Sequence, residues 1–250
     1  YEIMPSLVGS EMCIRDRDSI AYLKTRVREV IYDAEHFFDG YKADSRYALD
    51  TLRAAVEGGA DALVLCDTNG GSMPWEVENI IQVVRAAFPE VTLGIHAHND
   101  GGLALANSLA AIRAGAVHVQ GTMNGYGERC GNADLCALIP CLELKLGLNV
   151  LPPKRLRRLT RVARTVAAIA NQTLQRQAPY VGPSAFAHKG GIHVAAMRRN
   201  PRSYQHIDPA LVGNRARVLV SELSGRGNLL SKAEELGIAS QEIENLPQVL

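Results

Sequence analysis

The sequence predicts an α/β fold: a partial TIM (β/α)8 barrel made of the C-terminal four βα units, followed by a mostly helical subdomain. Strand-like and helix-like segments alternate four times between residues 27 and 147. One strand-like segment is apolar almost throughout, as expected for a parallel strand buried on both faces. Polar side chains follow each strand, at the end where barrel enzymes build their active sites.

The first two βα units have clear patterns. Residues 27–37 are rich in β-branched and aromatic side chains, which favours a strand. Residues 45–59 carry apolar side chains at helical spacing and end in Gly-Gly, a common helix stop. The apolar strand at residues 60–70 precedes Pro74, which suits the first turn of a helix over residues 74–88.

The third unit combines a strand at residues 91–98 with a helix at residues 103–115, and the fourth a strand at 116–125 with a helix at 132–147. Such alternation indicates right-handed βαβ crossovers and a parallel sheet. A closed barrel needs eight units, so we infer half a barrel whose N-terminal half is missing. An open, doubly wound sheet would show the same alternation and stays possible at this point.

The pattern changes after the two prolines at 152–153. Residues 154–175 predict one amphipathic helix, with its arginines largely on the polar face, which we interpret as solvated rather than as a nucleic-acid surface. Residues 185–197 are expected to form a loop. The apolar face of the helix is predicted to comprise Leu156, Leu159, Val162, Val166 and Ile169.

Composition narrows the class of protein. The net charge of +1 over 250 residues gives no argument for nucleic acid or an anionic membrane, and no apolar run is long enough to span a bilayer. The five cysteines show no CxxC pairing, which fits reduced thiols in a cytoplasmic protein. We therefore expect a cytoplasmic protein that binds neither nucleic acid nor membrane.

Residues 1–17 are a separate tract. They lack the basic start and apolar core of a signal peptide, and they resemble translated sequencing-adapter read-through. We interpret them as a sequencing artefact, with a genuine N-terminal arm as the alternative.

Two histidines end the third strand. His96 and His98 are two residues apart, so both side chains point to one side of the strand and can reach one cation, whereas Ala97 points the other way. Two imidazoles with further oxygen or amide ligands suit Mg²⁺, Mn²⁺ or Zn²⁺. Two unrelated polar residues at a strand end would give the same pattern.

The other strand ends also carry reactive side chains. Glu35 can act as a general base, and the hydroxyl of Thr68 can bind a carboxylate; a solvated acid and a plain turn at Asn69 are the alternatives. Loop 124–134 has GxGxxxG spacing instead of the dinucleotide-binding GxGxxG, so we interpret it as a flexible loop at the barrel mouth. Asn132, within it, can be a helix N-cap or a ligand.

Together, five segments resemble the alpha-acyl transferases of the metal-dependent barrel family, which includes 2-isopropylmalate, homocitrate and citramalate synthases. The likeness covers about residues 18–240 and is greatest to the citramalate-forming branch, through EHFFDG, ERCGN and HKGGIHVAAM. In chain order the segments are DAEHFFDGY, LCDTNGG, GIHAHND, NGYGERCGN and AFAHKGGIHVAAM.

The resemblance implies binding roles for four residues. His96 and His98 would bind the divalent metal, with Asn132 as a further, weaker ligand. Thr68 would contact the carboxylate of a 2-oxo acid.

It also implies a catalytic set of Glu35, His193 and Tyr204. His193 would reach the active site of a partner subunit in a homodimer. Some relatives carry Asp two residues after this histidine, where this chain has Ala195.

The implied reaction is a Claisen-type condensation of acetyl-CoA with a 2-oxo acid. In the citramalate branch that acid is pyruvate, and the products are citramalate and CoA, on the route to isoleucine and the branched-chain amino acids. A base removes a methyl proton from acetyl-CoA, the enolate attacks a ketone polarised by the metal, and water cleaves the thioester. We favour His193 acting with Glu35 as that base.

The family's Asp-Arg-Glu run on the first barrel strand and its C-terminal regulatory domain are not found in the sequence. We therefore expect residues 18–150 to be the C-terminal half of the catalytic barrel and residues 151–250 to be a helical linker region, truncated before the regulatory domain. We also expect the chain alone to be inactive.

Three alternatives remain. The first is 2-isopropylmalate or homocitrate synthase, within the same family. The second is a hydroxymethylglutaryl-CoA (HMG-CoA) lyase or a biotin-dependent carboxyltransferase, which would share the HxH strand but would not be expected to carry AFAHKGGIH. The third is a non-catalytic fragment.

Overall fold

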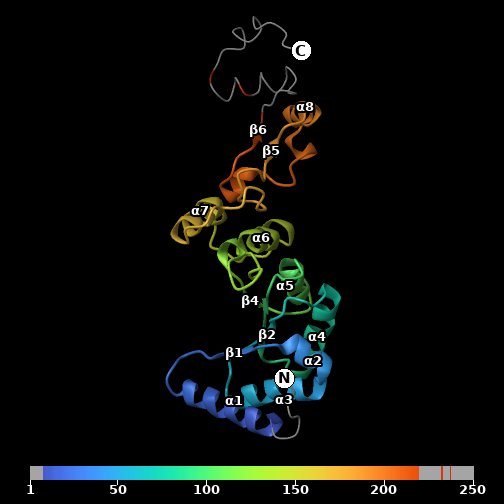
Figure 1. The fold of residues 1–250 in the computed structure, drawn as a ribbon, viewed down its shortest axis with the longest axis vertical. Helices are drawn as coiled ribbons and strands as arrows, with labels where there is room; N and C mark the ends of the chain where they lie inside the picture. Colours follow the sequence, from blue (N-terminus) through green and yellow to red (C-terminus); the bar gives the residue numbers. More distant parts are fainter. Residues whose placement is uncertain (1–7, 220–231, 233–236, 238–250) are drawn as a thin grey trace, which may run out of the picture. The chain divides into compact units, whose positions relative to one another are not determined.

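The computed structural model describes residues 8–219 together with residues 232 and 237 (Figure 1). The chain divides into two compact units, residues 1–138 and residues 139–250. Among the described residues, none of the helices combines the length and the apolar character needed to cross a membrane.

The first unit is built on a parallel sheet in the order β1-β2-β3-β4. This order follows the chain and, among the described residues, has no reversal of the kind that marks a doubly wound sheet. The fold is therefore α/β with four sequential parallel strands. Their bounds are β1 (Ile31–Ala34), β2 (Ala62–Asp67), β3 (Thr92–Ala97) and β4 (His118–Gln120).

Helices alternate with these strands, as the sequence predicts. Every residue of β2 is buried, which confirms the strand with two covered faces. Fully buried side chains such as Leu65 and Ile95 from the strands and Leu52 and Ile81 from the helices form the core. The helices are α1 (Val8–Lys24), α2 (Phe37–Ala43), α3 (Ser45–Glu57), α4 (Pro74–Ala87), α5 (Ala104–Arg113) and α6 (Leu135–Pro140), which a π-helical turn (Cys141–Lys145) continues.

The strand predicted over residues 27–37 is wrong at its C-terminal end. β1 stops at Ala34, and the chain turns at His36, whose φ of 59° is left-handed. Phe37 and Phe38 then start α2, with their rings edge to face and buried in the core. The aromatic pair that suggested a strand thus supplies the buried side of a short helix.

The fourth unit also differs from its predicted bounds. β4 ends at Gln120, and the next residue, Gly121, lies so close to the Ala133 carbonyl oxygen that a Cβ there would be 2.6 Å from it. The following helix starts at Leu135, where the Asp134 side chain accepts a hydrogen bond from the Cys136 backbone.

Helix α1 includes residues 8–17, which the sequence interpretation sets aside. It packs against α3 (Figure 1), Ile20 is buried, and Asp16 accepts a hydrogen bond from the Tyr32 hydroxyl at 2.9 Å. Residues 1–7 lie outside the described residues. The interpretation of residues 1–17 as an artefact stays a prediction.

The second unit contains α7 (Leu159–Ile169), β5 (Ala187–His188), α8 (Gly191–Arg199) and β6 (Arg217–Val218), with β5 and β6 paired in parallel. The prediction of a loop at residues 185–197 is therefore wrong, because β5 and α8 occupy most of it.

The amphipathic helix predicted over residues 154–175 is shorter, and its apolar face is partly wrong. Helix α7 buries the small side chains of Ala163 and Ala167, whereas Val162 and Ile169 are 38% and 81% exposed. Thr160, at the start of the helix, is buried and donates a hydrogen bond to the Val212 carbonyl oxygen at 2.7 Å.

Candidate active site

The C-terminal ends of the parallel strands gather four of the candidate residues at one edge of the sheet. Glu35 directly follows β1, Thr68 directly follows β2, His96 lies in β3, and His98 is one residue beyond it. The register pairs Cys66 with His96 across β2 and β3, so these ends lie at the same level.

The two histidines lie side by side. Their ring centroids are 5.3 Å apart and their planes differ by 25°, while Ala97 between them is buried on the opposite side. The strand alternation predicts this arrangement. Two imidazoles are therefore presented to one space beyond β3.

Amide groups contact both ring nitrogens of His96. Its Nε2 lies 2.9 Å from Asn132 Oδ1, and its Nδ1 lies 2.7 Å from Gln120 Oε1. The Asn132 amide nitrogen donates to the Tyr126 carbonyl oxygen at 3.2 Å. Asn132 is therefore not a helix N-cap: Asp134 caps α6, and Asn132 faces the histidine from a β-bridge with His98.

His98 carries an unsatisfied polar atom. Its Nδ1 is buried and finds no hydrogen-bond partner among the described residues. Burial lowers the pKa of His98, and the positive charges of Arg129 and His96 lower it further. Both effects favour the neutral imidazole, which is the form that binds metals.

These donors fit a divalent cation. The described residues hold no group of three or more His, Cys, Asp or Glu side chains suited to a metal ion. What they bring together instead is two imidazoles and one amide oxygen. Imidazole nitrogens with an oxygen donor are ligands for Zn²⁺ and Mn²⁺, and such a set leaves positions open for other ligands.

Thr68 is anchored from two sides. Its hydroxyl oxygen accepts a hydrogen bond from the His36 backbone at 2.7 Å, and its carbonyl accepts one from Arg129 at 2.6 Å. The Arg129 guanidinium also forms a bidentate ion pair with the Asp100 carboxylate, through Nε at 2.8 Å and Nη2 at 2.9 Å. This hydrogen bonding lowers the pKa of Asp100. Thr68 and Asn69 also lie in a turn, which the Gly70 backbone closes by donating to the Asp67 carbonyl oxygen at 3.1 Å, and the Asn69 side chain donates to Asp39 at 2.7 Å.

Glu35 is exposed at the same edge. Burial raises the pKa of the Cys66 thiol to about 12, and the charges of Asp33 and Glu35 contribute to that rise. The two carboxylates therefore lie close to the end of β2.

The remaining candidates belong to the second unit. His193 is exposed on α8, and its ring stacks on that of Tyr204 with centroids 4.2 Å apart and planes 27° from parallel. Gly190 lies beside this ring, and a Cβ there would be in ordinary contact with it at 3.6 Å.

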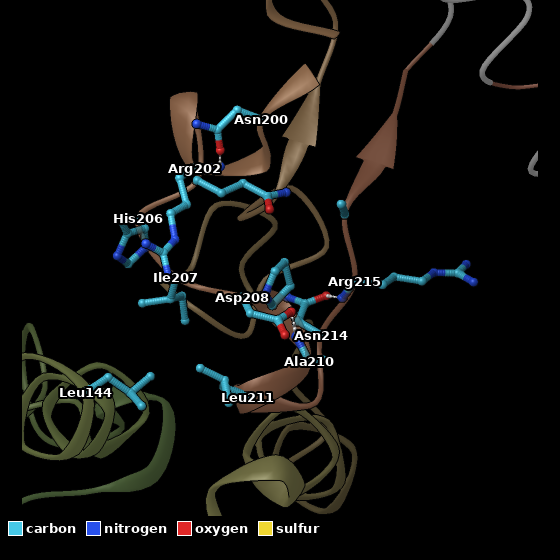
Figure 2. A pocket seen from close by; sticks show the side chains of 13 residues that line it. Leu144, Asn200, Arg202, His206, Ile207, Asp208, Ala210, Leu211, Asn214 and Arg215 are labelled. Carbon is cyan, nitrogen blue, oxygen red and sulfur yellow. Dashed lines mark hydrogen bonds between the residues drawn. The ribbon is translucent and has the colours of Figure 1, made fainter. Parts of the chain in front are cut away.

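The second unit also has an open cavity of about 1110 Å³ (Figure 2). His193 and Tyr204 are not among its lining residues. Figure 2 shows Arg215 extending away from the other labelled side chains.

Sequence reasoning missed four residues of the site in the first unit. Arg129 and Asp100 lie within the segments NGYGERCGN and GIHAHND, which the sequence analysis identified. The ion pair between them could not be predicted from either segment. No sequence pattern pointed to Gln120 or Asp33, because their hydrogen bond joins positions 87 residues apart.

Comparison with known families matches nearly all of the chain. The family model described as HMGL-like matches residues 10–166. A second model, described as homocitrate synthase post-HMGL domain-like, matches residues 180–249.

Two similar curated proteins are (R)-citramalate synthases. The synthase of Aquifex aeolicus is 55% identical over 221 residues, which are 88% of this chain and 42% of that protein. The synthase of Synechocystis is 56% identical over 229 residues, which are 89% of this chain and 42% of that protein. The chain thus spans about two fifths of the length of these relatives.

A solved HMG-CoA lyase structure from Bacillus subtilis superposes with a TM-score of 0.53, covering 65% of this chain and 56% of that one. Its sequence identity is 24%, so the likeness concerns the fold alone.

Proposed function

We propose that this chain, which belongs to the HMGL-like family, is part of an (R)-citramalate synthase that condenses acetyl-CoA with pyruvate to give citramalate and CoA. The observation that carries the proposal is the approach of Asn132 Oδ1 to His96 Nε2, at 2.9 Å beside His98, in a chain more than half identical to two such synthases. The reaction would serve isoleucine and branched-chain amino-acid biosynthesis.

The four-stranded sheet would be the C-terminal half of a TIM barrel, over residues 18–150, with residues 151–250 as a linker region; the match of the family model also includes residues 10–17. A barrel requires a curved sheet, and a side-chain contact between β1 and β4 supports such curvature. In a flat sheet, three strand spacings would separate β1 from β4 by about 14 Å. Asp33 of β1 nevertheless accepts a hydrogen bond from Gln120 of β4 at 2.8 Å, so the sheet must be curved.

His96, His98 and Asn132 would hold the divalent metal, which is Mg²⁺, Mn²⁺ or Zn²⁺. When bound, the metal supplies Lewis-acid polarisation of the 2-oxo acid carbonyl. The buried, unpartnered Nδ1 of His98 and the depressed pKa of that ring favour a neutral ligand over a charged surface histidine.

Thr68 would bind the carboxylate of pyruvate. Its hydroxyl oxygen already accepts a hydrogen bond from the His36 backbone, so the hydroxyl proton is directed to a different acceptor. Arg129 fixes the Thr68 carbonyl and thereby the position of this donor.

His193 would take the methyl proton of acetyl-CoA, with Glu35 assisting and with Tyr204 orienting the imidazole through the ring stack. The resulting enolate carbon would bond to the keto carbon of pyruvate. Water would then cleave the thioester and release CoA. In a homodimer, His193 would serve the partner subunit's site.

The test is an assay of CoA release in the full-length enzyme with acetyl-CoA and each of pyruvate, 2-oxoisovalerate and 2-oxoglutarate. We expect turnover with pyruvate and its loss in His96→Ala. A preference for 2-oxoisovalerate or 2-oxoglutarate would indicate 2-isopropylmalate or homocitrate synthase instead. Cleavage of HMG-CoA without any condensation would indicate a lyase.

A further inference from the structure

We propose that Asp33 and Gln120 are positioning residues that keep the proton of neutral His96 on Nδ1 and so present the lone pair of Nε2 to a divalent cation. The inference rests on the metal site of the proposed function. It adds two residues to that site, and it follows from the polarity of each hydrogen bond in one chain of contacts across the sheet.

The chain of contacts starts at the Asp33 carboxylate, which can only accept hydrogen bonds. Gln120 Nε2 lies 2.8 Å from Asp33 Oδ1, so the donor end of the amide must face the aspartate. The carbonyl end of the Gln120 amide then faces the opposite direction. The orientation of Gln120 is therefore set by a residue from the far strand of the sheet.

The next contact fixes the tautomer of His96. Gln120 Oε1 lies 2.7 Å from His96 Nδ1, and an amide oxygen offers only lone pairs. Nδ1 must therefore carry a hydrogen atom. In a neutral imidazole the other nitrogen, Nε2, then has a lone pair in the plane of the ring.

The far end of the chain of contacts is fixed in the same way. The Tyr126 carbonyl can only accept, so the 3.2 Å contact with Asn132 Nδ2 turns Asn132 Oδ1 toward His96. Two lone-pair acceptors, Nε2 and Oδ1, thus face each other at 2.9 Å. When His96 is neutral, neither Nε2 nor Oδ1 can donate a hydrogen bond to the other. A cation between them can be coordinated by the lone pairs of both atoms.

Three variants of the full-length enzyme test the inference. Gln120→Leu removes the acceptor, and Asp33→Ala releases the Gln120 amide to rotate. Asp33→Asn is the matched control, because its side-chain oxygen can still accept from Gln120.

Two readouts are independent of turnover. The first is the ¹⁵N spectrum of His96 without metal, recorded about two pH units above the ordinary histidine pKa of ~6.5. The second is the affinity for Mn²⁺ by calorimetry. We expect the Nδ1-protonated tautomer in the wild type and in Asp33→Asn. In Gln120→Leu and Asp33→Ala we expect mixed tautomers and Mn²⁺ binding weakened about 10- to 100-fold.

The inference is overturned if Gln120→Leu keeps both the Nδ1-protonated tautomer and the wild-type Mn²⁺ affinity. It is also overturned if Asp33→Asn behaves like Asp33→Ala, because the Asp33 charge would then matter more than the amide orientation. If the tautomer and the affinities follow expectation but the wild type forms no citramalate, the proposed function fails and the positioning role stands.

Discussion

A methyl group placed on Gly127 should disable the proposed metal site while leaving the fold intact. The Cβ of a Gly127→Ala variant would lie 2.1 Å from Asn132 Nδ2 and 3.0 Å from its Cγ. Gly127 does not have a left-handed φ, so alanine fits its backbone without strain. The severe collision is with the end of a side chain, which can move, and the Gly131 Cα, at 3.3 Å, needs to give by only about a tenth of an ångström.

The size of that movement follows from the contact distances. Ordinary contacts of a Cβ begin at 3.4 Å, so the Asn132 amide must retreat by about 1.3 Å. Its 3.2 Å hydrogen bond to Tyr126 would break, and its oxygen would leave the 2.9 Å contact with His96. Loss of a ligand position on this scale should weaken Mn²⁺ binding by at least the roughly 10- to 100-fold seen when partners of metal ligands are removed.

Stability should change little. Losing one partly buried hydrogen bond costs about 0.5–1.5 kcal/mol. Replacing glycine by alanine at a compatible backbone position returns about 0.4–1 kcal/mol by restricting the unfolded chain. The two effects nearly cancel, so the free energy of unfolding should stay within about 1 kcal/mol of wild type.

The assay combines Mn²⁺ calorimetry with urea unfolding, and Gly71→Ala is the matched control. A Cβ at Gly71 meets no atom within 4 Å, and this glycine also lacks a left-handed φ. We expect the control to bind Mn²⁺ like the wild type. Equal Mn²⁺ affinity in Gly127→Ala and Gly71→Ala would show that the Asn132 amide does not contribute to the metal site.

Two further predictions concern the core and the thiols. Ile95→Ala, at a fully buried position in β3, should lower the free energy of unfolding by about 2–5 kcal/mol in a urea titration, and a loss below 1 kcal/mol would contradict the packing of this strand. Iodoacetamide at pH 8 followed by peptide mass spectrometry should modify the exposed Cys130 well before Cys66 and Cys136, because burial raises the pKa of both latter thiols to about 12. Equal labelling rates would refute that protection.

Local sequence patterns were sufficient to predict the bounds of the elements that follow one regular pattern of buried positions. The continuous apolar run at β2 and the periodic helices α3, α4 and α5 match their predicted bounds closely, because one element's own pattern decides its state. The pair Phe37-Phe38 shows where this fails. Aromatic side chains favour strands on average, yet both rings fill the core from a helix.

The prediction of the buried face of helix α7 fails for a related reason. Its large apolar side chains Val162 and Ile169 are exposed, and Ala163 is buried instead. Which side of a helix is covered depends on the segments packed against it, and the segment around Val212 accepts a hydrogen bond from Thr160 at the start of α7. That information lies outside the helix, so hydrophobic periodicity alone could not supply it.

Some features of the candidate site could likewise be predicted from local sequence patterns, and others could not. Strand alternation predicts that His96 and His98 share one side, and their rings do lie together. The contacts that orient them come from Asn132 and Gln120, which lie on other segments. Curvature of the sheet brings Asp33 to Gln120, and no local pattern encodes that curvature.

The electrical neutrality of these donors has a consequence for substrate selection. In the proposed metal site, the two imidazoles and the amide oxygen of this chain carry no net charge, so other groups must balance the charge of a divalent cation. The carboxylate of a 2-oxo acid is an anion that would approach the same space from Thr68. Metal and oxo acid would then each tighten the binding of the other, and this coupling is reciprocal by thermodynamic necessity. In the proposed site, a neutral ketone of the same shape could not balance that charge as the carboxylate of an oxo acid would.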